Sequence, residues 1–209
     1  MDFKINSYTH ILGGYKVADE MAKHGASAST FADWWAYKYE VIDAIPQNMC
    51  IMQERGVVVS LNSDDRDLIR RLNQEAAKAM TYCGMSAEDA LKMVTINPAK
   101  QLRIDQHVGS IKVGKDADFV IWNGSPLSTY SSVQQTWIDG RKYFDLQDDL
   151  KVRDAVQKEK NLLMQKVLQG GKLATNGDKS AYLVPQTQWH CEDHGDYWHF
   201  INQLQQGAH

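Results

Sequence analysis

Short apolar segments alternate with longer segments of helical periodicity through the first 85 residues. The clearest apolar segment is 57–61, Val-Val-Val-Ser-Leu, a continuous run of the kind that parallel sheets bury on both faces. Helical spacing is clearest over 65–83, where Leu68, Leu72 and Ala76 recur at intervals of four. The pattern predicts strands at 3–9, 26–31 and 57–61, and helices at 12–24, 46–55 and 65–83. Such alternation favours a parallel α/β sheet.

The second half of the chain changes from helical to strand-like spacing. Ser86 is the expected N-cap of a helix at 87–94, and Asn97-Pro98 is expected to stop that helix. Turn residues then separate short β-like segments, and Asp139-Gly140 is a strong hairpin signal. The predicted strands are 107–111, 117–122, 133–138 and 141–144, and a last helix covers 147–169. We therefore expect a small antiparallel sheet followed by a long helix.

Composition and charge narrow the class of protein. The 209 residues are 43% hydrophobic and 23% charged, values typical of a folded soluble domain. A net charge of −3 gives no electrostatic reason to expect nucleic acid as a partner. No apolar run approaches the roughly 20 residues that cross a bilayer. The first ten residues do not resemble a signal peptide, so we expect a cytoplasmic location if Met1 is the true start.

The cysteines and the C-terminal histidines are candidate disulfide or metal-binding residues. Three widely spaced cysteines predict neither a disulfide framework nor a CxxC knuckle, so Cys50 and Cys83 are expected to be small buried apolar residues. The tail holds a partial metal knuckle that matches no standard zinc-finger spacing: His190, Cys191, His194 and His199. A surface tail is the simpler interpretation.

Four sequence runs carry a resemblance to a known family. They are THILGGYK at 9–16, VVSLNSDD at 58–65, ALKMVTINPAK at 90–100 and VGSIKVGKDADFV at 108–120. Residues 9–144 resemble the amidohydrolase superfamily, in particular its imidazolonepropionase-like and prolidase-like branch.

That resemblance implies a fold and a division of the chain. It implies the last three βα units of a partial (β/α)8 TIM barrel, then a small β-sandwich portion and a C-terminal helix. The expected domains are residues 1–104 for the barrel part, 105–146 for the composite β-sandwich and 147–209 for the helix and tail. An intact barrel needs roughly 250 residues, so we expect this chain to be a C-terminal fragment.

The resemblance also implies a metal site. His10 matches the family's sixth-strand histidine and Asp64 its eighth-strand aspartate, while the His-x-His pair, the bridging residue and the fifth-strand histidine have no match. The expected cofactor is one or two divalent metal ions, zinc first, in the complete enzyme, with weak or no binding by this chain. Asp64 is expected to take a proton from metal-activated water and pass it to the leaving nitrogen. Without the resemblance, His10 would be a loop residue, and Asp64 or Asp65 a helix cap.

Further polar and aromatic residues are candidates for substrate binding. Phe31, Asp33, Trp34 and Lys38 follow the second strand, where α/β barrels bind ligands, and the alternative is a loop that packs on its own barrel. Glu75, four residues after Arg71, is expected on a solvated helix face with no functional role.

Three functions from different classes remain open at this point. The first is a piece of a metal-dependent hydrolase that cleaves a non-aromatic carbon–nitrogen bond in an amide, cyclic amide or dipeptide. The second is a catalytically inactive remnant that persists as an oligomeric or structural protein. The third is a small metal-binding module that uses the tail. The expected partners are a small-molecule or dipeptide substrate in the complete enzyme, and either a second copy of the chain or the missing N-terminal barrel part.

Overall fold

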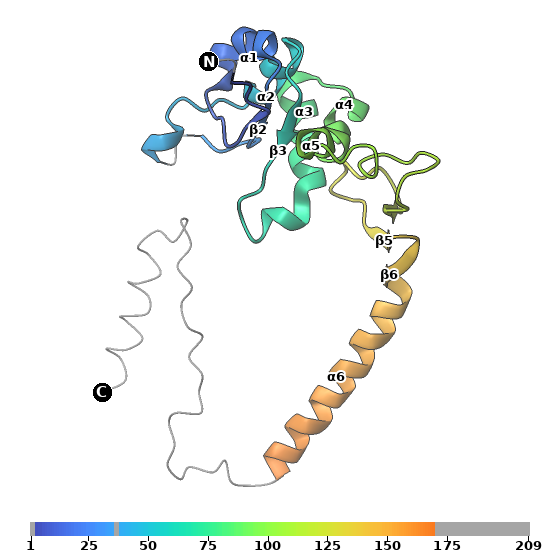
Figure 1. Cartoon of the computed structure of the whole chain (residues 1–209). Helices are drawn as coiled ribbons and strands as arrows, with labels where there is room; N and C mark the ends of the chain where they lie inside the picture. The colour runs from blue at the N-terminus through green and yellow to red at the C-terminus, as the bar shows by residue number, and fades with distance from the viewer. Residues whose placement is uncertain (1–2, 36–37, 170–209) are drawn as a thin grey trace, which may run out of the picture. The chain divides into compact units, whose positions relative to one another are not determined.

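The computed structural model describes residues 3–35 and 38–169 and is a mixed α/β structure (Figure 1). The chain divides into two compact units, residues 1–157 and 158–209. The first unit holds both sheets. Within the described residues, no helix is long and apolar enough to span a membrane.

The first sheet has three parallel strands in the order β1-β2-β3. They are β1 (Ser7–Tyr8), β2 (Ser27–Thr30) and β3 (Val59–Leu61), each inside a predicted strand. The helices that follow them are α1 (Ala18–His24), α2 (Asn48–Glu54) and α3 (Leu72–Cys83). The sequence pattern therefore identified the three strand–helix units correctly, although each strand is shorter than expected.

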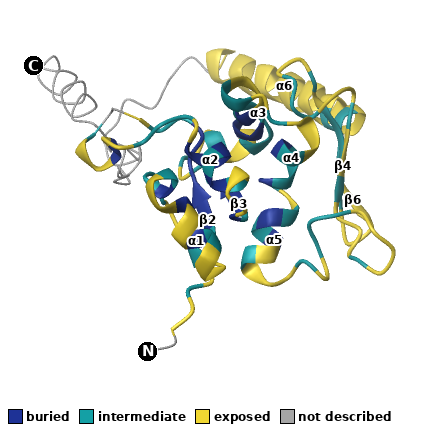
Figure 2. Cartoon of the chain, turned by 90° about the horizontal axis from the view of Figure 1, so that it is seen from above, coloured by how far each residue is buried: buried dark blue, intermediate teal, exposed yellow. Residues whose placement is uncertain are grey.

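One face of this sheet packs against the helices. Ala28, Val59 and Leu61 alternate along the strands with polar neighbours, and they join Met49 and Met52 of α2 in one buried cluster. Figure 2 shows the buried segments gathered where β2 and β3 meet the surrounding helices. Burial of such side chains is the main favourable term in folding, at about 25 cal/mol per Å² of apolar surface.

Two predicted helices begin later than the spacing suggested. The segment predicted at 12–24 starts as a 3₁₀ turn, Gly14–Val17, and the segment at 65–83 starts as another, Leu68–Arg71. A further 3₁₀ turn lies at Tyr39–Val41. Asp65 has the capping role expected of it, because its Oδ1 accepts hydrogen bonds from the backbone N–H groups of Asp67 and Leu68.

The expectation that Asn97-Pro98 ends a helix was wrong. Helix α4 (Ala87–Lys92) ends earlier, with Ser86 as its N-cap, and a further helix, α5 (Ile96–Leu102), contains both residues. Pro98 is tolerated because it lies in the first turn, where N–H groups have no partner within the helix. Asn97 Nδ2 donates to Val59 O at 2.8 Å, and Leu61 N donates to Met93 O at 3.1 Å. The outer edge of β3 therefore has hydrogen-bond partners in α5 and in the turn after α4.

The second sheet is antiparallel, in the order β4-β5-β6. It consists of β4 (Phe119–Trp122), β5 (Val133–Ile138) and β6 (Arg141–Asp145). Asp139 and Gly140 both have positive φ, 50° and 70°, as the predicted tight hairpin requires. The strand predicted at 107–111 was wrong: that segment is a loop, in which Lys115 Nζ donates to Val108 O at 3.1 Å.

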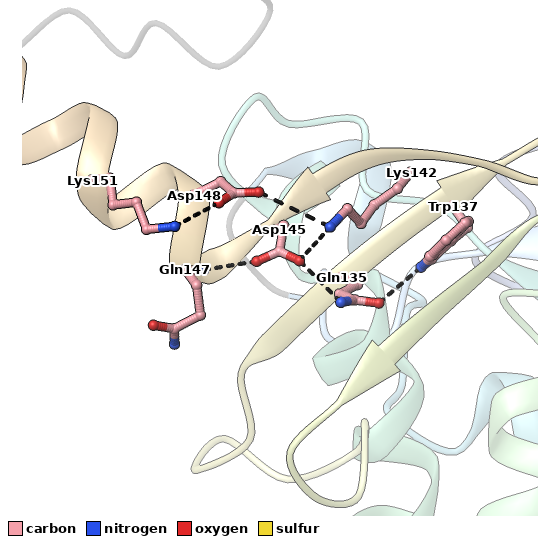
Figure 3. A network of polar contacts seen from close by, with 7 residues as sticks. All are labelled: Gln135, Trp137, Lys142, Asp145, Gln147, Asp148 and Lys151. Carbon is pink, nitrogen blue, oxygen red and sulfur yellow. Dashed lines mark hydrogen bonds and ion pairs between the residues drawn. The ribbon is translucent and has the colours of Figure 1, made fainter.

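Helix α6 (Leu146–Gln169) continues directly from β6. Asp145 is the centre of the junction: its Oδ1 accepts from Gln147 N at 3.0 Å, and its Oδ2 accepts from Lys142 Nζ at 2.7 Å and from Gln135 Nε2 at 3.0 Å. Figure 3 shows how this carboxylate joins two strands to the first turn of α6.

The interpretation of two cysteines as separate apolar residues was also wrong. Cys50 of α2 and Cys83, the last residue of α3, form a disulfide with Cα atoms 6.4 Å apart. Cys50 is buried as expected. Spacing along the chain could not reveal the pair, because two helices separated by a strand bring it together.

Candidate functional site

Two of the predicted site residues meet at one edge of the parallel sheet. His10 follows β1 and Asp64 follows β3, and the carboxyl ends of parallel strands lie at the same edge. His10 Nε2 lies 3.9 Å from Asp64 Oδ2, and the two side chains are 47% and 54% exposed. The fold thus places an imidazole and a carboxylate side by side and open to solvent.

Both residues have an unusual backbone. The φ angles of His10 and Asp64 are 57° and 48°, in the left-handed region that non-glycine residues seldom adopt. Such conformations cost of order 1 kcal/mol or more and are concentrated at functional sites. Both residues of the pair therefore adopt a strained backbone conformation at the point where their side chains approach each other.

The pair has the donor chemistry of two metal ligands. Neutral imidazole nitrogen and carboxylate oxygen are both common zinc donors, with bond lengths of about 2.0 to 2.2 Å. Two such bonds at the tetrahedral angle of zinc hold their donor atoms roughly 3.4 Å apart, so the 3.9 Å between Nε2 and Oδ2 has to shorten slightly for both to bind one ion. In the part of the chain that the structure describes, no group of three His, Cys, Asp or Glu side chains could hold a metal. The tail residues His190, Cys191, His194 and His199 lie outside that part.

Aromatic side chains of the loop after β2 adjoin the pair. The Phe31 ring lies 5.1 Å from the His10 ring, and Trp34 stacks on Phe31 with centroids 4.1 Å apart and planes 10° apart. Phe31 is only 5% exposed. Of the predicted substrate residues, Phe31 is therefore beside His10, and Trp34 is stacked on Phe31. Lys38 forms an ion pair with Glu40 at 2.7 Å.

Asp33 takes part in a cluster that the sequence did not reveal. Its Oδ2 accepts from Lys78 Nζ at 2.5 Å, and Lys78 Nζ also donates to Glu75 Oε1 at 2.7 Å. The expectation that Glu75 lies on a solvated face was wrong, because Glu75 is only 2% exposed. Its position four residues before Ala79, on the packed side of α3, was the available signal.

Burial and pairing shift the pKa values of this cluster. Burial raises the pKa of the Glu75 carboxyl, and the hydrogen bond from Lys78 only partly opposes this effect. Burial also acts to lower the pKa of Lys78, but the hydrogen bonds to Asp33 and Glu75 outweigh it, so the pKa of Lys78 is raised. The lysine therefore remains an ammonium group at neutral pH.

Comparison with known proteins gives the family. Residues 47–154 match the Amidohydrolase family, which is more than half of the chain. Amidohydrolase tasK of Hapsidospora irregularis is 32% identical over 149 residues, which are 69% of this chain and 15% of that protein. Imidazolonepropionase of Shewanella frigidimarina is 56% identical over 45 residues, 22% of this chain and 11% of that protein.

A solved structure agrees with the sequence matches. The crystal structure of an amidohydrolase from Thermotoga maritima MSB8 superposes with a TM-score of 0.62 and 32% identity, covering 66% of this chain and 37% of that one. The chain belongs to the amidohydrolase family. It spans well under half the length of the proteins that it matches.

Proposed function

We propose that this chain is the C-terminal part of a metal-dependent amidohydrolase, which cleaves a non-aromatic carbon–nitrogen bond in an amide, a cyclic amide or a dipeptide. The approach of His10 and Asp64 to 3.9 Å at one edge of the parallel sheet is the observation that carries this proposal. In the complete protein, β1, β2 and β3 would be the last three strands of a (β/α)8 barrel, within a part covering residues 1–104. Residues 105–146 would contribute to a β-sandwich, and 147–209 would follow as helix and tail.

The two residues of the pair have different roles in the proposed reaction. A divalent metal such as zinc, when bound, acidifies a water molecule and polarises the carbonyl group that is attacked. His10 has no negative charge and would hold the ion through Nε2. Asp64 would hold it as well, accept the proton of the attacking water on its carboxylate, and donate that proton to the leaving nitrogen. Two ligands are one fewer than the three protein ligands usual for catalytic zinc, so the others would come from the rest of the parent.

The aromatic loop would form one wall of the substrate site. Trp34 would offer a flat apolar surface, and the buried Phe31 beneath it would hold it near His10. Lys38 would pair with a substrate carboxylate in exchange for Glu40. The carboxylate of Asp33 is paired with Lys78, so Asp33 would help to position the loop rather than bind the substrate directly.

The second candidate function is a non-catalytic, oligomeric protein. The observation that favours it is the ligand count, because two donors are a weak metal site by themselves. An assay on the purified 209-residue chain with dipeptides, N-acyl amino acids and lactams and added Zn, Mn or Co separates both candidates from an enzyme that works by itself. We expect no turnover above background. Metal-dependent turnover that disappears in Asp64→Asn would show instead that the chain is itself an enzyme.

The site assignment is tested in the complete parent, or in a complex with the missing N-terminal part. His10→Ala should mainly lower metal content, because it removes a neutral ligand and leaves the proton acceptor. Asp64→Asn should lower turnover by roughly 10²-fold or more, because it removes the base. Asp65→Asn is the matched control, since an asparagine Oδ1 can still accept the two backbone hydrogen bonds. If Asp65→Asn is inactive while Asp64→Asn works normally, the assignment of Asp64 is wrong.

A further inference from the structure

The buried carboxylate of Glu75 requires a cation, and Lys78 supplies it. Glu75 lies on α3 beside Ala76 and Ala79, both 0% exposed. A carboxylate in such surroundings is strongly unfavourable unless it is paired. Lys78, one turn further along α3, donates to Glu75 Oε1 at 2.7 Å. The ammonium group is thereby held at a defined position on the helix surface.

The same ammonium group reaches another segment of the chain. Lys78 Nζ donates to Asp33 Oδ2 at 2.5 Å, across 45 positions of sequence. Asp33 lies in the loop that follows β2, between Phe31 and Trp34. The loop has a second attachment to α3, because the Trp35 ring meets the edge of the Tyr82 ring, with centroids 6.0 Å apart.

The two attachments lie on one side of the helix. Lys78 and Tyr82 are four residues apart on α3, so their side chains are neighbours on its surface. Between these attachments, Trp34 stacks on Phe31, and Phe31 contacts the ring of His10. A displacement of the loop from α3 would therefore move the aromatic pair relative to His10.

We propose that Lys78 is a positioning residue of the candidate site: held by the buried Glu75, it fixes Asp33 and so keeps the Phe31–Trp34 stack against His10. The proposal rests on the proposed function only in treating this loop as a wall of the substrate site. The hydrogen bonds of Lys78 go to Glu75 and Asp33 rather than to His10 or Asp64, so it acts through the loop.

Amide hydrogen exchange of the full chain tests the proposal without metal or substrate. Lys78→Met removes the charge and keeps a similar unbranched side chain, shorter by one heavy atom. We expect exchange of residues 31–35 to rise about tenfold or more, since a hydrogen bond between charged groups is lost. Lys78→Arg should restore much of the protection. Lys92→Met is the matched control, because Lys92 pairs with Glu88 and Asp89 within α4 and has no link to the loop.

A second variant keeps the test decisive if Lys78→Met unfolds the chain. Asp33→Asn weakens the loop end of the link and leaves the Glu75–Lys78 pair in place. It should loosen residues 31–35 while α1 and α2 keep their protection, and in the Lys78→Met background it should add little. Unchanged exchange at 31–35 in Asp33→Asn, or an equal rise throughout the first unit, overturns the proposal. These measurements are independent of the turnover and metal assays, so each proposal can fail alone.

Discussion

At Gly109, in the run 108–120, packing against α5 requires a glycine. Its φ is +84°, in a region that glycine adopts readily. A Cβ at this position would lie 2.8 Å from the Ala99 Cβ of α5 and 3.0 Å from the Ile96 Cα. The loop therefore approaches α5 so closely that a side chain has no room.

We expect Gly109→Ala to lower the free energy of unfolding by about 2 kcal/mol or more, because it adds a clash with backbone to the strain of positive φ. Gly114→Ala is the matched control. Gly114 has nearly the same φ, +89°, but a Cβ there would meet nothing within 4 Å. It should cost about 1 kcal/mol. Equal losses for the two variants in urea unfolding would show that packing against α5 contributes nothing.

Sequence reasoning at this scale found the residues that follow strands and missed one that lies inside a helix. His10 and Asp64 could be predicted to meet, because the ends of parallel strands share an edge. The structure places their side chains 3.9 Å apart, and their chemical roles remain proposals. The burial of Glu75 was not predicted, because its spacing of four residues from Arg71 also fits an ion pair on an exposed helix face. Its burial depends on Lys78 and on Asp33 from another segment.

At the scale of elements, the disulfide joins two helices that the sequence treated as independent. Cys50 and Cys83 close a loop with a sequence separation of 33. A cross-link over such a loop stabilises a fold by about 3 to 4 kcal/mol, through the entropy of the unfolded chain.

Cys83→Ser should lower the free energy of unfolding by that amount, and treatment of the unchanged chain with a reductant should do the same. Cys191→Ser is the control, because Cys191 is not part of the pair. Unfolding curves with and without reductant provide the measurement. A chain whose stability is the same in both conditions would contradict the prediction, as would two free thiols at Cys50 and Cys83 in the untreated protein.

The start of α6 depends on one carboxylate, Asp145. The hydrogen bond from Lys142 is the main cause that holds the pKa of Asp145 below its usual value, and the N–H of Gln147 adds to it. A lowered pKa in the folded state stabilises the fold above the pKa of the unfolded chain, near 3.8. That stabilisation is lost as the pH falls through the lower, folded value.

The difference in unfolding free energy between the unchanged chain and Asp145→Asn should therefore depend on pH in a defined direction. It should be constant at and above about pH 5 and shrink toward zero as the pH falls below the unfolded value, because the protonated acid resembles the amide. Urea unfolding of both proteins from pH 7 to pH 2 checks this. A difference that grows at low pH would mean that Asp145 is not stabilised as a carboxylate.

Periodicity located most elements, because spacing reports which face is buried. It did not locate the 3₁₀ turns, which depend on local hydrogen bonds such as those of Asp65. It also missed α5, because Pro98 was taken as the end of a helix when it lies in the first turn of the next one. The loop at 107–111 was mistaken for a strand because its sequence is β-like, yet Ile111 is 86% exposed and the segment pairs with no strand of the described residues.

At the scale of the whole molecule, the described residues expose several large apolar side chains to solvent. In α6, Val152, Val156, Leu163 and Val167 are 53% to 61% exposed. Their spacing of four and seven residues places them on one face of the helix. β1 is an edge strand with one described neighbour, β2. Exposed apolar patches and strand edges both favour association with another chain.

We therefore expect the purified chain to form a dimer or a larger assembly, with a mass of at least twice 23.7 kDa by light scattering at tens of micromolar. The combined change Val156→Lys and Leu163→Lys should shift it toward the monomer, because each charge would be desolvated in an interface that uses this face. Leu162→Lys is the matched control: Leu162 is 63% exposed, but a helix turns by about 100° per residue, which places it on another side. A monomeric unchanged chain would contradict association altogether. An assembly that persists in the double variant would place the contact elsewhere, with the open edge of β1 as the next surface to test.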